Sequence, residues 1–232
     1  FVSIMPCIAK KHEARRPEME FDGVRDVDYV LTTREYARLL KRKGVDFMNL
    51  EDSVPFGDLA KYSGAAVIFG ATGGVMEAAL RTVSEILEGE ITPIEYTAAR
   101  GMEGIKEATL NVAGIDVNIA VVHGGSSIKD FFAKIKKSKK QYHFVEFMAC
   151  TGGCINGGGQ PIHPAIIQDN YDIRTLRAKS LYEIDSNKET RKSHLNETVM
   201  NLYTEWLEKP GSHKAHKLLH TKYAPRKYYV NN

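Results

Sequence analysis

The first part of the chain pairs a short apolar run with a helix signal. Residues 27–31 are mostly apolar and predict a short strand. Thr32 and Glu35 follow with the three-residue spacing of a capping box, so a helix is expected to begin here. Basic residues and Gly44 should end it.

A second apolar run, at residues 65–69, predicts a strand that a glycine-rich loop at residues 70–74 joins to another helix. The helix pattern rests on apolar residues three or four positions apart, namely Met76, Leu80, Val83 and Leu87. A glycine loop before a helix could hold a phosphate group. This loop lacks the Lys-Ser/Thr pair of a P-loop and the glycine spacing of a dinucleotide site, which argues against nucleotide binding.

The middle of the chain has the pattern of a β-hairpin. Apolar residues at 107–112 and 117–122 predict two strands with a turn at residues 113–114. Ser126 or Ser127 is expected to cap the next helix.

That helix should end in the lysine-rich stretch at residues 134–140, where positive charge is favourable at a solvated helix C-terminus. Residues 142–148 then predict a strand that leads directly into a loop of cysteines and glycines. Because α/β folds place their chemistry at the carboxyl ends of strands, this loop is the first candidate for a functional site.

Helical spacing also marks the C-terminal part, before a break at Pro210. It is carried by Val199, Leu202, Tyr203, Trp206 and Leu207. His213, His216 and His220 could share one helix face, but no carboxylate completes an evident metal site there. The whole pattern predicts an α/β fold with mixed or parallel sheets flanked by helices, and a helical C-terminal tail.

Composition narrows the functional classes. The chain has 232 residues, 43% of them hydrophobic, and a net charge of +3, so it can bury a core and shows no general signature of nucleic-acid binding. No apolar run approaches the roughly 20 residues that span a bilayer. With only three cysteines, a disulfide framework is not expected and a reducing compartment is favoured.

The cysteines carry the clearest chemical signal. Cys150 and Cys154 lie in a loop with five glycines, whose small residues let the backbone wrap a bulky inorganic group. Cys7 follows Pro6, and Lys10 places a cation one helical turn beyond its sulfur, which would favour the thiolate. Spacing alone favours an iron-sulfur cluster, but it leaves a zinc site or buried free thiols open.

Two motifs resemble the second and third signature motifs of the iron-only ([FeFe]) hydrogenases: Met5-Pro6-Cys7-x2-Lys10-x2-Glu13 and Glu146-x-Met148-x-Cys150-x3-Cys154-x2-Gly157-Gly158-Gly159-Gln160-Pro161. The similarity extends to residues 26–35, to residues 69–78 and to the tail around residues 212–220. It covers essentially the whole chain. The resemblance implies part of a two-lobed catalytic domain, with residues 1–190 of large-subunit type and residues 191–232 as a small-subunit-like tail.

The resemblance also implies a cofactor and roles for its surroundings. The cofactor is the H-cluster, a 4Fe-4S cubane linked to a di-iron unit with carbonyl, cyanide and a bridging dithiolate, at which protons and electrons form dihydrogen reversibly. Cys7 and Cys150 would bind the cubane, and Cys154 would bind it and bridge to the di-iron unit.

Around that cofactor, Lys10 would donate a hydrogen bond to cyanide, and Glu13 would hold Lys10 or its loop in place. The remaining cofactor-binding positions would form an apolar wall that excludes water: Met5, Phe69, Gly70 and Met148.

The family's first motif, with a fourth cluster cysteine and a cysteine that relays protons, would precede Phe1. We therefore expect a fragment, a processed chain or one piece of a split enzyme, inactive by itself, which needs a segment or subunit that carries the fourth cysteine. Other expected partners are maturation proteins and a ferredoxin-type electron carrier, which the lysines of residues 136–140 could dock. A cytoplasmic location is expected, with a periplasmic one left open by the unseen start of the protein.

Two other classes share much of this pattern. Narf-like cytosolic iron-sulfur assembly factors have the cysteines and much of the Met5-to-Glu13 motif but no hydrogen chemistry. Residues 69–78 and Pro161 look more like the enzymes. Sensory hydrogenase homologues differ in segments that these residues do not include.

Overall fold

The computed structural model describes residues 1–53, 57, 61–89 and 95–225. Its largest sheet contains β5 (Ile105–Val112), β6 (Ile115–His123) and β7 (Phe144–Met148) in that order. β5 and β6 form the expected antiparallel hairpin, whose turn at Ala113 and Gly114 has positive φ at both residues. β7 runs parallel to β6, and α5 (Gly125–Lys137) makes the crossover.

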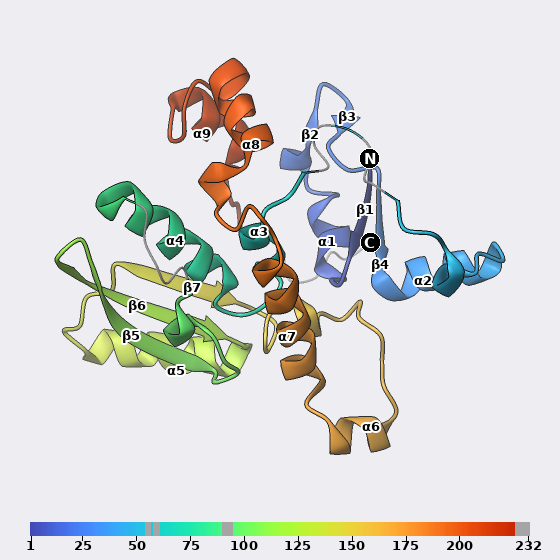
Figure 1. The fold of residues 1–232 in the computed structure, drawn as a ribbon, viewed down its shortest axis with the longest axis horizontal. Helices are drawn as coiled ribbons and strands as arrows, with labels where there is room; N and C mark the ends of the chain where they lie inside the picture. Colours follow the sequence, from blue (N-terminus) through green and yellow to red (C-terminus); the bar gives the residue numbers. More distant parts are fainter. Residues whose placement is uncertain (54–56, 58–60, 90–94, 226–232) are drawn as a thin grey trace.

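This sheet is covered on both faces, as Figure 1 shows. On one face, Met76 and Leu80 of α4 (Gly74–Glu88) pack against Ile119 and Val121. On the other, Phe131 of α5 packs against Ala120 and Val122. Alternate residues of β6 therefore pack into two separate parts of the core, because successive side chains of a strand point to opposite faces of the sheet.

The N-terminal part forms a second unit around a parallel pair of strands. β1 (Val2–Met5) pairs with β4 (Tyr29–Thr32), and α1 (Ala9–Glu13) lies between them in the chain. The predicted capping box is confirmed at the start of α2 (Thr33–Arg42), where the Thr32 side chain and the Glu35 carboxylate bond each other's backbone N–H. A short antiparallel pair, β2 (Glu20–Phe21) and β3 (Val24–Arg25), stands apart.

The remaining elements are helical. The α-helices are α3 (Gly64–Ile68), α6 (Ala165–Asn170), α7 (Ile173–Ser186), α8 (Glu197–Leu202) and α9 (His213–Leu219). A π-helical turn, η7 (Tyr203–Leu207), continues α8, and short 3-10 turns occur at η1 (Pro17–Met19), η2 (Phe47–Asn49), η4 (Thr97–Ala99), η5 (Cys154–Asn156) and η6 (Ser193–Leu195). The predicted fold class, mixed α/β with a helical C-terminal tail, is confirmed. A search of the described residues for a helix long and apolar enough to cross a bilayer gives none.

The strand predicted at residues 65–69 is wrong, because these residues form the short helix α3. The Ser63 side chain caps it by accepting a hydrogen bond from the Ala66 N–H, and α3 packs against α7. A short apolar run has no period by which a buried helix can be told from a buried strand.

Three smaller expectations also need correction. Neither Ser126 nor Ser127 caps α5, which begins at Gly125 after Gly124, a residue with φ of +82°. The buried face of α4 includes Glu77, Arg81 and Ser84, while Val83 and Leu87 are exposed. The last strand begins at Phe144 because Tyr142 packs on the ring of Phe131 instead.

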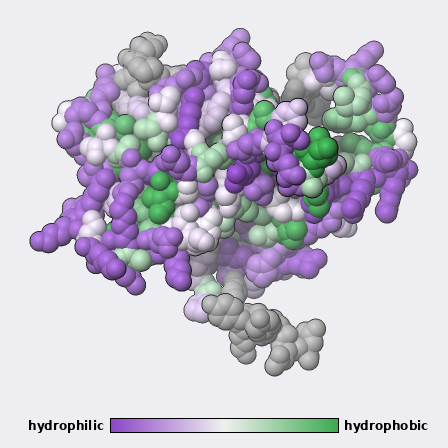
Figure 2. Space-filling model, turned by 90° about the horizontal axis from the view of Figure 1, so that it is seen from below, coloured by the Kyte–Doolittle hydropathy of each residue, from purple (hydrophilic) through white to green (hydrophobic). Residues whose placement is uncertain are grey.

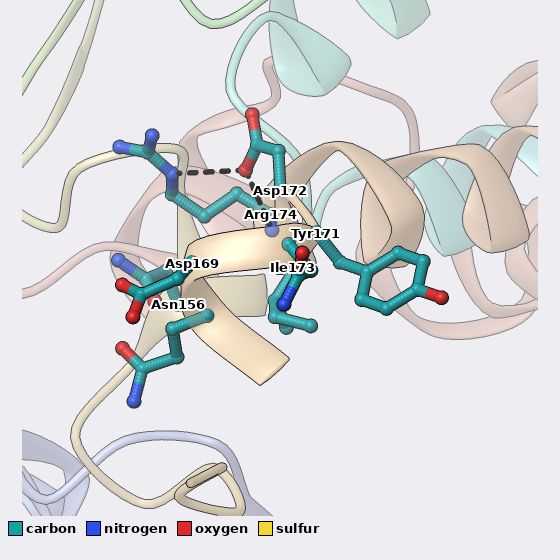
Figure 3. Close-up of a pocket in the computed structure, with 8 residues that line it drawn as sticks. Asn156, Asp169, Tyr171, Asp172, Ile173 and Arg174 are labelled. Atoms are coloured by element: carbon teal, nitrogen blue, oxygen red, sulfur yellow. Dashed lines mark hydrogen bonds and ion pairs between the residues drawn. The ribbon is translucent and has the colours of Figure 1, made fainter. Parts of the chain in front are cut away.

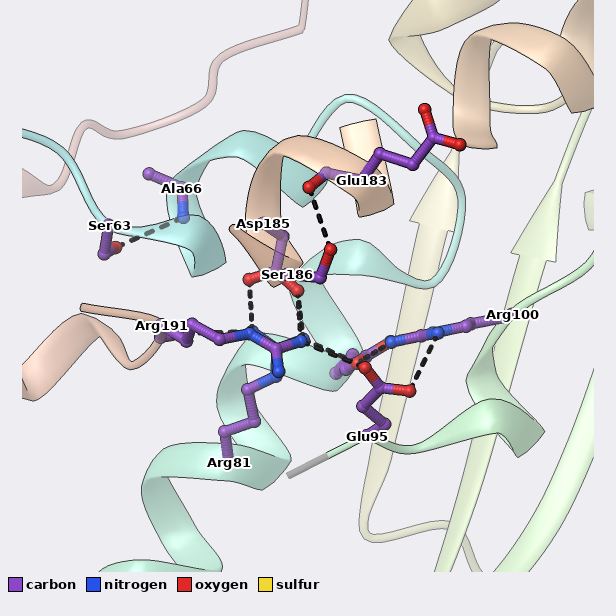
Figure 4. A network of polar contacts seen from close by, with 10 residues as sticks. Ser63, Ala66, Arg81, Glu95, Arg100, Glu183, Asp185, Ser186 and Arg191 are labelled. Atoms are coloured by element: carbon purple, nitrogen blue, oxygen red, sulfur yellow. Dashed lines mark hydrogen bonds and ion pairs between the residues drawn. The ribbon is translucent and has the colours of Figure 1, made fainter. Parts of the chain in front are cut away.

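A buried group of charges joins α4 to α7, and Figure 4 shows Asp185 facing the guanidinium of Arg81. Arg81 bonds both Asp185 oxygens at 2.8 Å and Glu77 at 2.7 Å, and all three side chains are 0% exposed. Arg191 bonds Asp185 and Arg100 bonds Glu77. Burial alone would raise the pKa of Asp185, but Arg81 and Arg191 hold it below its ordinary value, so the carboxylate stays charged.

Most of the surface in Figure 2 is hydrophilic, with apolar residues in separate groups. The β1–β4 pair nevertheless exposes apolar side chains, including those of Phe1, Val2, Ile4 and Tyr29. Parallel strands are usually covered on both faces, so this exposure is unusual for such a pair.

Candidate metal centre

The structure brings the three cysteines to one place. Cys7 follows β1, while Cys150 and Cys154 lie in the loop after β7, and the Gly159 N–H donates to the Pro6 carbonyl at 2.9 Å. Partial burial and the neighbouring Cys150 and Cys7 thiols raise the pKa of Cys154, whereas Lys10 opposes this effect. Cys7, Cys150 and Lys10 therefore all lie near enough to Cys154 to influence its charge.

Glycines allow this close approach. A Cβ atom on Gly157 would lie 2.2 Å from the Pro6 carbonyl oxygen, so no side chain fits between the two segments. Gly153 has φ of +97°, and a Cβ there would lie 2.8 Å from both the Gly70 oxygen and the Thr72 nitrogen. The predicted need for small residues in this loop is thus explained by backbone packing.

The cysteine loop also packs on the loop before α4. The Thr72 N–H donates to the Gly152 carbonyl at 3.1 Å, and the Ile155 N–H donates to the Gly70 carbonyl at 3.0 Å. These bonds bring Gly70, with Phe69 next to it in the chain, to the edge of the cysteine loop.

The other predicted positions flank the cysteines. Met5 ends β1 and Met148 ends β7, each two residues before a cysteine and half-buried. Lys10 and Glu13 lie on α1 and form an ion pair, and both side chains are partly exposed. The ion pair joins these two side chains, while the positioning role expected for Glu13 stays a prediction.

Two side chains of the sheet that had no predicted role fix the elements around the site, Glu146 at the start of α4 and His123 at the cysteine loop. Glu146 of β7 is buried and caps α4, because its carboxylate accepts from the Gly73 N–H at 2.6 Å and the Met76 N–H at 2.8 Å. His123 ends β6, and its Nδ1 accepts from the Gly152 N–H at 3.0 Å. Burial lowers the pKa of His123, which favours the neutral imidazole, and the hydrogen bond from Gly152 fits the tautomer whose Nδ1 carries no proton. The sequence did contain a signal for Glu146, because a charged residue stands there within a predicted strand that is otherwise mostly apolar.

Replacing Glu146 by glutamine is expected to reduce the free energy of unfolding by about 2 kcal/mol, because hydrogen bonds to charged groups contribute about 1.5–3 kcal/mol each and the amide presents a donor to one helix N–H. Urea unfolding measures the change. Glu197→Gln, at an exposed surface carboxylate, is the matched control. An equal loss in both variants would contradict the capping role.

Lys106 of β5 lies near Glu146 and is only 7% exposed, with its Nζ donating to the Gly101 carbonyl at 2.7 Å. Burial lowers its pKa from 10.5 to about 8, although Glu146 and Glu103 favour the charged form. Between these two values the unfolded chain binds more protons than the folded protein, so this lysine makes stability rise with pH there.

As the pH rises from about 8 to 10.5, the free energy of unfolding of the parent protein should therefore rise relative to that of a Lys106→Met variant. The expected rise is up to about 1.4 kcal/mol per pH unit. Urea unfolding of both proteins at neutral pH and at the alkaline end of the window measures the difference. Lys179→Met, at an exposed lysine, should show no such trend. A stability difference that stays constant with pH would contradict the burial effect.

The donor set distinguishes the kinds of metal site. Among the described residues, no three His, Cys, Asp or Glu side chains are placed to hold one metal ion. In a zinc site, the thiolates would all lie about 2.3 Å from one point. A cubane takes each thiolate on a different iron, so three converging thiols in a glycine cradle fit an iron-sulfur cluster. His213, His216 and His220 form no such group either.

A polar cavity of about 580 Å³ lies beside this centre, and Figure 3 shows its lining. Asn156 comes from the cysteine loop and the other lining residues come from α6 and the start of α7, where Asp172 caps the helix and pairs with Arg174 at 3.3 Å. The cysteines are not among its lining residues, so this cavity is separate from the thiols.

Comparisons with known proteins agree with this geometry. Residues 1–158 match the family described as iron only hydrogenase large subunit, C-terminal domain, and residues 171–226 match iron hydrogenase small subunit. The chain is 47% identical to iron hydrogenase 1 of Clostridium pasteurianum over 96% of this chain and 39% of that protein. It is 36% identical to Protein NAR1 of Arabidopsis thaliana over 97% of this chain and 50% of that protein.

Solved structures give the same result. The [FeFe]-hydrogenase HydA1 of Chlamydomonas reinhardtii matches with a TM-score of 0.77 and 34% identity, over 96% of this chain and 62% of that one. The structure of HydA(deltaEFG), solved to follow stepwise H-cluster assembly, matches with a TM-score of 0.76 and 35% identity, at the same coverage. The chain thus spans 39% of iron hydrogenase 1 and 62% of the two solved hydrogenases.

Proposed function

The chain belongs to the iron-only hydrogenase family, and we propose that it forms the C-terminal part of a catalytic domain that interconverts protons, electrons and dihydrogen. The observation that carries this proposal is the convergence of Cys7, Cys150 and Cys154, with Lys10 beside them, against a glycine backbone in which side chains do not fit. In the proposed division, residues 1–190 belong to the large-subunit-type domain and residues 191–232 form its helical tail.

The cofactor of this proposal is the H-cluster, which when bound supplies the redox chemistry of hydrogen. Cys7 and Cys150 would hold its cubane, and Cys154 would hold the cubane and the di-iron unit together. Three thiolates repel one another, and bound iron relieves that repulsion.

The protein's own residues prepare the surroundings. Lys10, held by Glu13, would donate to a cyanide ligand, since a charge-assisted hydrogen bond is strong where water is excluded. Met5, Met148, Phe69 and Gly70 would form the wall that excludes water. These roles rest on the resemblance of the motifs, and the positions beside the cysteine loop support them.

The proposal requires partners. These residues contain three cysteines, so a fourth cubane thiolate must come from another segment or subunit. The exposed apolar side chains of the β1–β4 pair support such a segment, because they offer a surface for it to cover. We further propose a ferredoxin-type electron carrier, maturation proteins that insert the di-iron unit, and a cytoplasmic location.

Hydrogen evolution from reduced methyl viologen tests the proposal, with infrared detection of carbonyl and cyanide bands. The chain should be produced with a segment or subunit that supplies the fourth thiolate and with the maturation proteins. Activity together with both kinds of band is the expected result, whereas the chain alone should evolve no hydrogen. Hydrogen evolution by the chain alone would contradict the need for partners.

A second candidate is an iron-sulfur assembly factor, which the similarity to Protein NAR1 favours. The identities to three hydrogenase sequences, 44% to 51%, exceed the 32% to 36% seen with the assembly proteins. The two solved hydrogenases, at 34% and 35%, lie within the range of the assembly proteins. Bound iron without infrared bands or activity would favour this class instead.

A further inference from the structure

Two arginines from distant elements hold the outer side of the cysteine loop. Arg34, in the first turn of α2, donates from Nη1 to the Gln160 carbonyl and from Nη2 to the Gly158 carbonyl, both at 2.8 Å. Its backbone N–H also donates to the Gly159 carbonyl at 3.1 Å. Arg34 therefore binds three consecutive residues of the loop.

Arg177 of α7 binds the two ends of the same segment. Its Nη1 donates to the Ile155 carbonyl at 2.8 Å, and its Nη2 donates to the Pro161 carbonyl at 3.0 Å. The same Nη2 lies 3.2 Å from His163 Nε2. Ile155 directly follows Cys154, so Arg177 fixes the backbone next to that thiol.

Neither arginine has a counter-ion among the described residues. In residues 1–53, 57, 61–89 and 95–225, all hydrogen-bond partners of these two guanidiniums are carbonyl oxygens or the imidazole, and neither forms an ion pair. Burial lowers the pKa of Arg177, and no carboxylate opposes that effect. Arg174, one turn earlier on α7, pairs with Asp172 by contrast.

We propose that Arg34 and Arg177 are positioning residues that clamp residues 155–161, and that their unpaired charges raise the reduction potential of the cluster bound at Cys154. The clamp keeps the backbone beside Cys154 in one position. A thiolate-ligated cluster gains negative charge on reduction, so nearby cations favour the reduced form. The effect on potential rests on the proposed function, whereas the clamp itself does not.

Substitutions can separate two properties of Arg177: its positive charge, and the planar guanidinium that bonds two carbonyls at once. Arg177→Gln removes both, while Arg177→Lys keeps the charge but cannot bridge two carbonyls, because an ammonium is a compact point charge. Lys179→Gln, on the exposed face of the same helix, removes the same charge away from the loop and is the control.

In the assembled protein, Arg177→Gln is expected to lower the midpoint potential of the cluster, measured by redox titration with electron paramagnetic resonance, and Arg177→Lys should restore most of it. Both variants should lose iron to a chelator several-fold faster than the control. An unchanged potential in Arg177→Gln would overturn the charge effect. Iron release as slow as in the control would overturn the clamp.

Thiol labelling of the metal-free protein tests the clamp without a cluster. Alkylation of Cys154, followed by mass spectrometry, should be several-fold faster in Arg177→Gln and in Arg34→Gln than in the control, with circular dichroism confirming the fold. Two variants in different elements keep the test valid if one fails to fold. Equal labelling rates would overturn the clamp, and a parent protein that binds no cluster would refute the proposed function and the charge effect together.

Discussion

Replacing Cys154 by serine is expected to abolish hydrogen turnover and to remove most of the cluster iron from the assembled protein. Cys154 is the one residue proposed to hold both halves of the cofactor, so its loss removes two attachments together. A serine hydroxyl cannot take over, because it is a harder ligand than a thiolate and stays protonated near neutral pH.

Iron content, infrared bands and hydrogen evolution measure the outcome of this substitution. Thr151→Ala is the matched control, since Thr151 is an exposed residue of the same loop and has no proposed ligand role. It should retain iron and activity. If the Cys154→Ser protein has full iron content and normal bands, Cys154 is not a ligand of the cluster. The convergence of the three cysteines would then no longer support the proposed function.

Replacing Asp185 by asparagine is expected to lower the free energy of unfolding by about 3 kcal/mol, because breaking a buried ion pair leaves an uncompensated charge. Asp185 is 0% exposed and accepts hydrogen bonds from Arg81 and Arg191. Asparagine has nearly the same shape, so the loss reports on charge and hydrogen bonding without a large cavity.

Urea unfolding compares this variant with Glu183→Gln on the same helix. Glu183 is exposed and its carboxylate lies 3.7 Å from Lys179, so its substitution should change stability by less than about 0.5 kcal/mol. If both variants have the same free energy of unfolding, the ion pairs of Asp185 add nothing to the stability of the protein. Asp185 and Arg177 both lie on α7, so a weaker attachment of this helix should also weaken the contacts of Arg177 with the cysteine loop. Asp185→Asn should therefore also speed iron release.

The local elements were predictable where nearby residues provide the interactions. The capping box of α2 needs only the backbone and side chains of Thr32 and Glu35. The β5–β6 hairpin is short-range in the same sense, since its turn joins neighbouring strands. The order of strand and cysteine loop was also readable, because β7 ends two residues before Cys150.

The error at α3 has the opposite origin. An apolar run of residues 65–69 suits either a buried strand or a buried helix, and packing against α7 decided for the helix. There, a Cβ on Gly64 would lie 2.1 Å from an Asp185 oxygen, so glycine permits the close contact. The proposed roles of the site residues and the division at residue 190 stay predictions.

The sequence by itself determined the family, the three thiols and the loop that carries two of them, since a motif records which residue types stand at which spacing. Only the tertiary structure decided what holds that loop. The bonds of Glu146 to the start of α4, of His123 to Gly152, and of Arg34 and Arg177 to the loop carbonyls join residues that are 16 to 126 positions apart. Such pairs leave no periodic trace in one sequence, because their partners are backbone groups that every residue possesses.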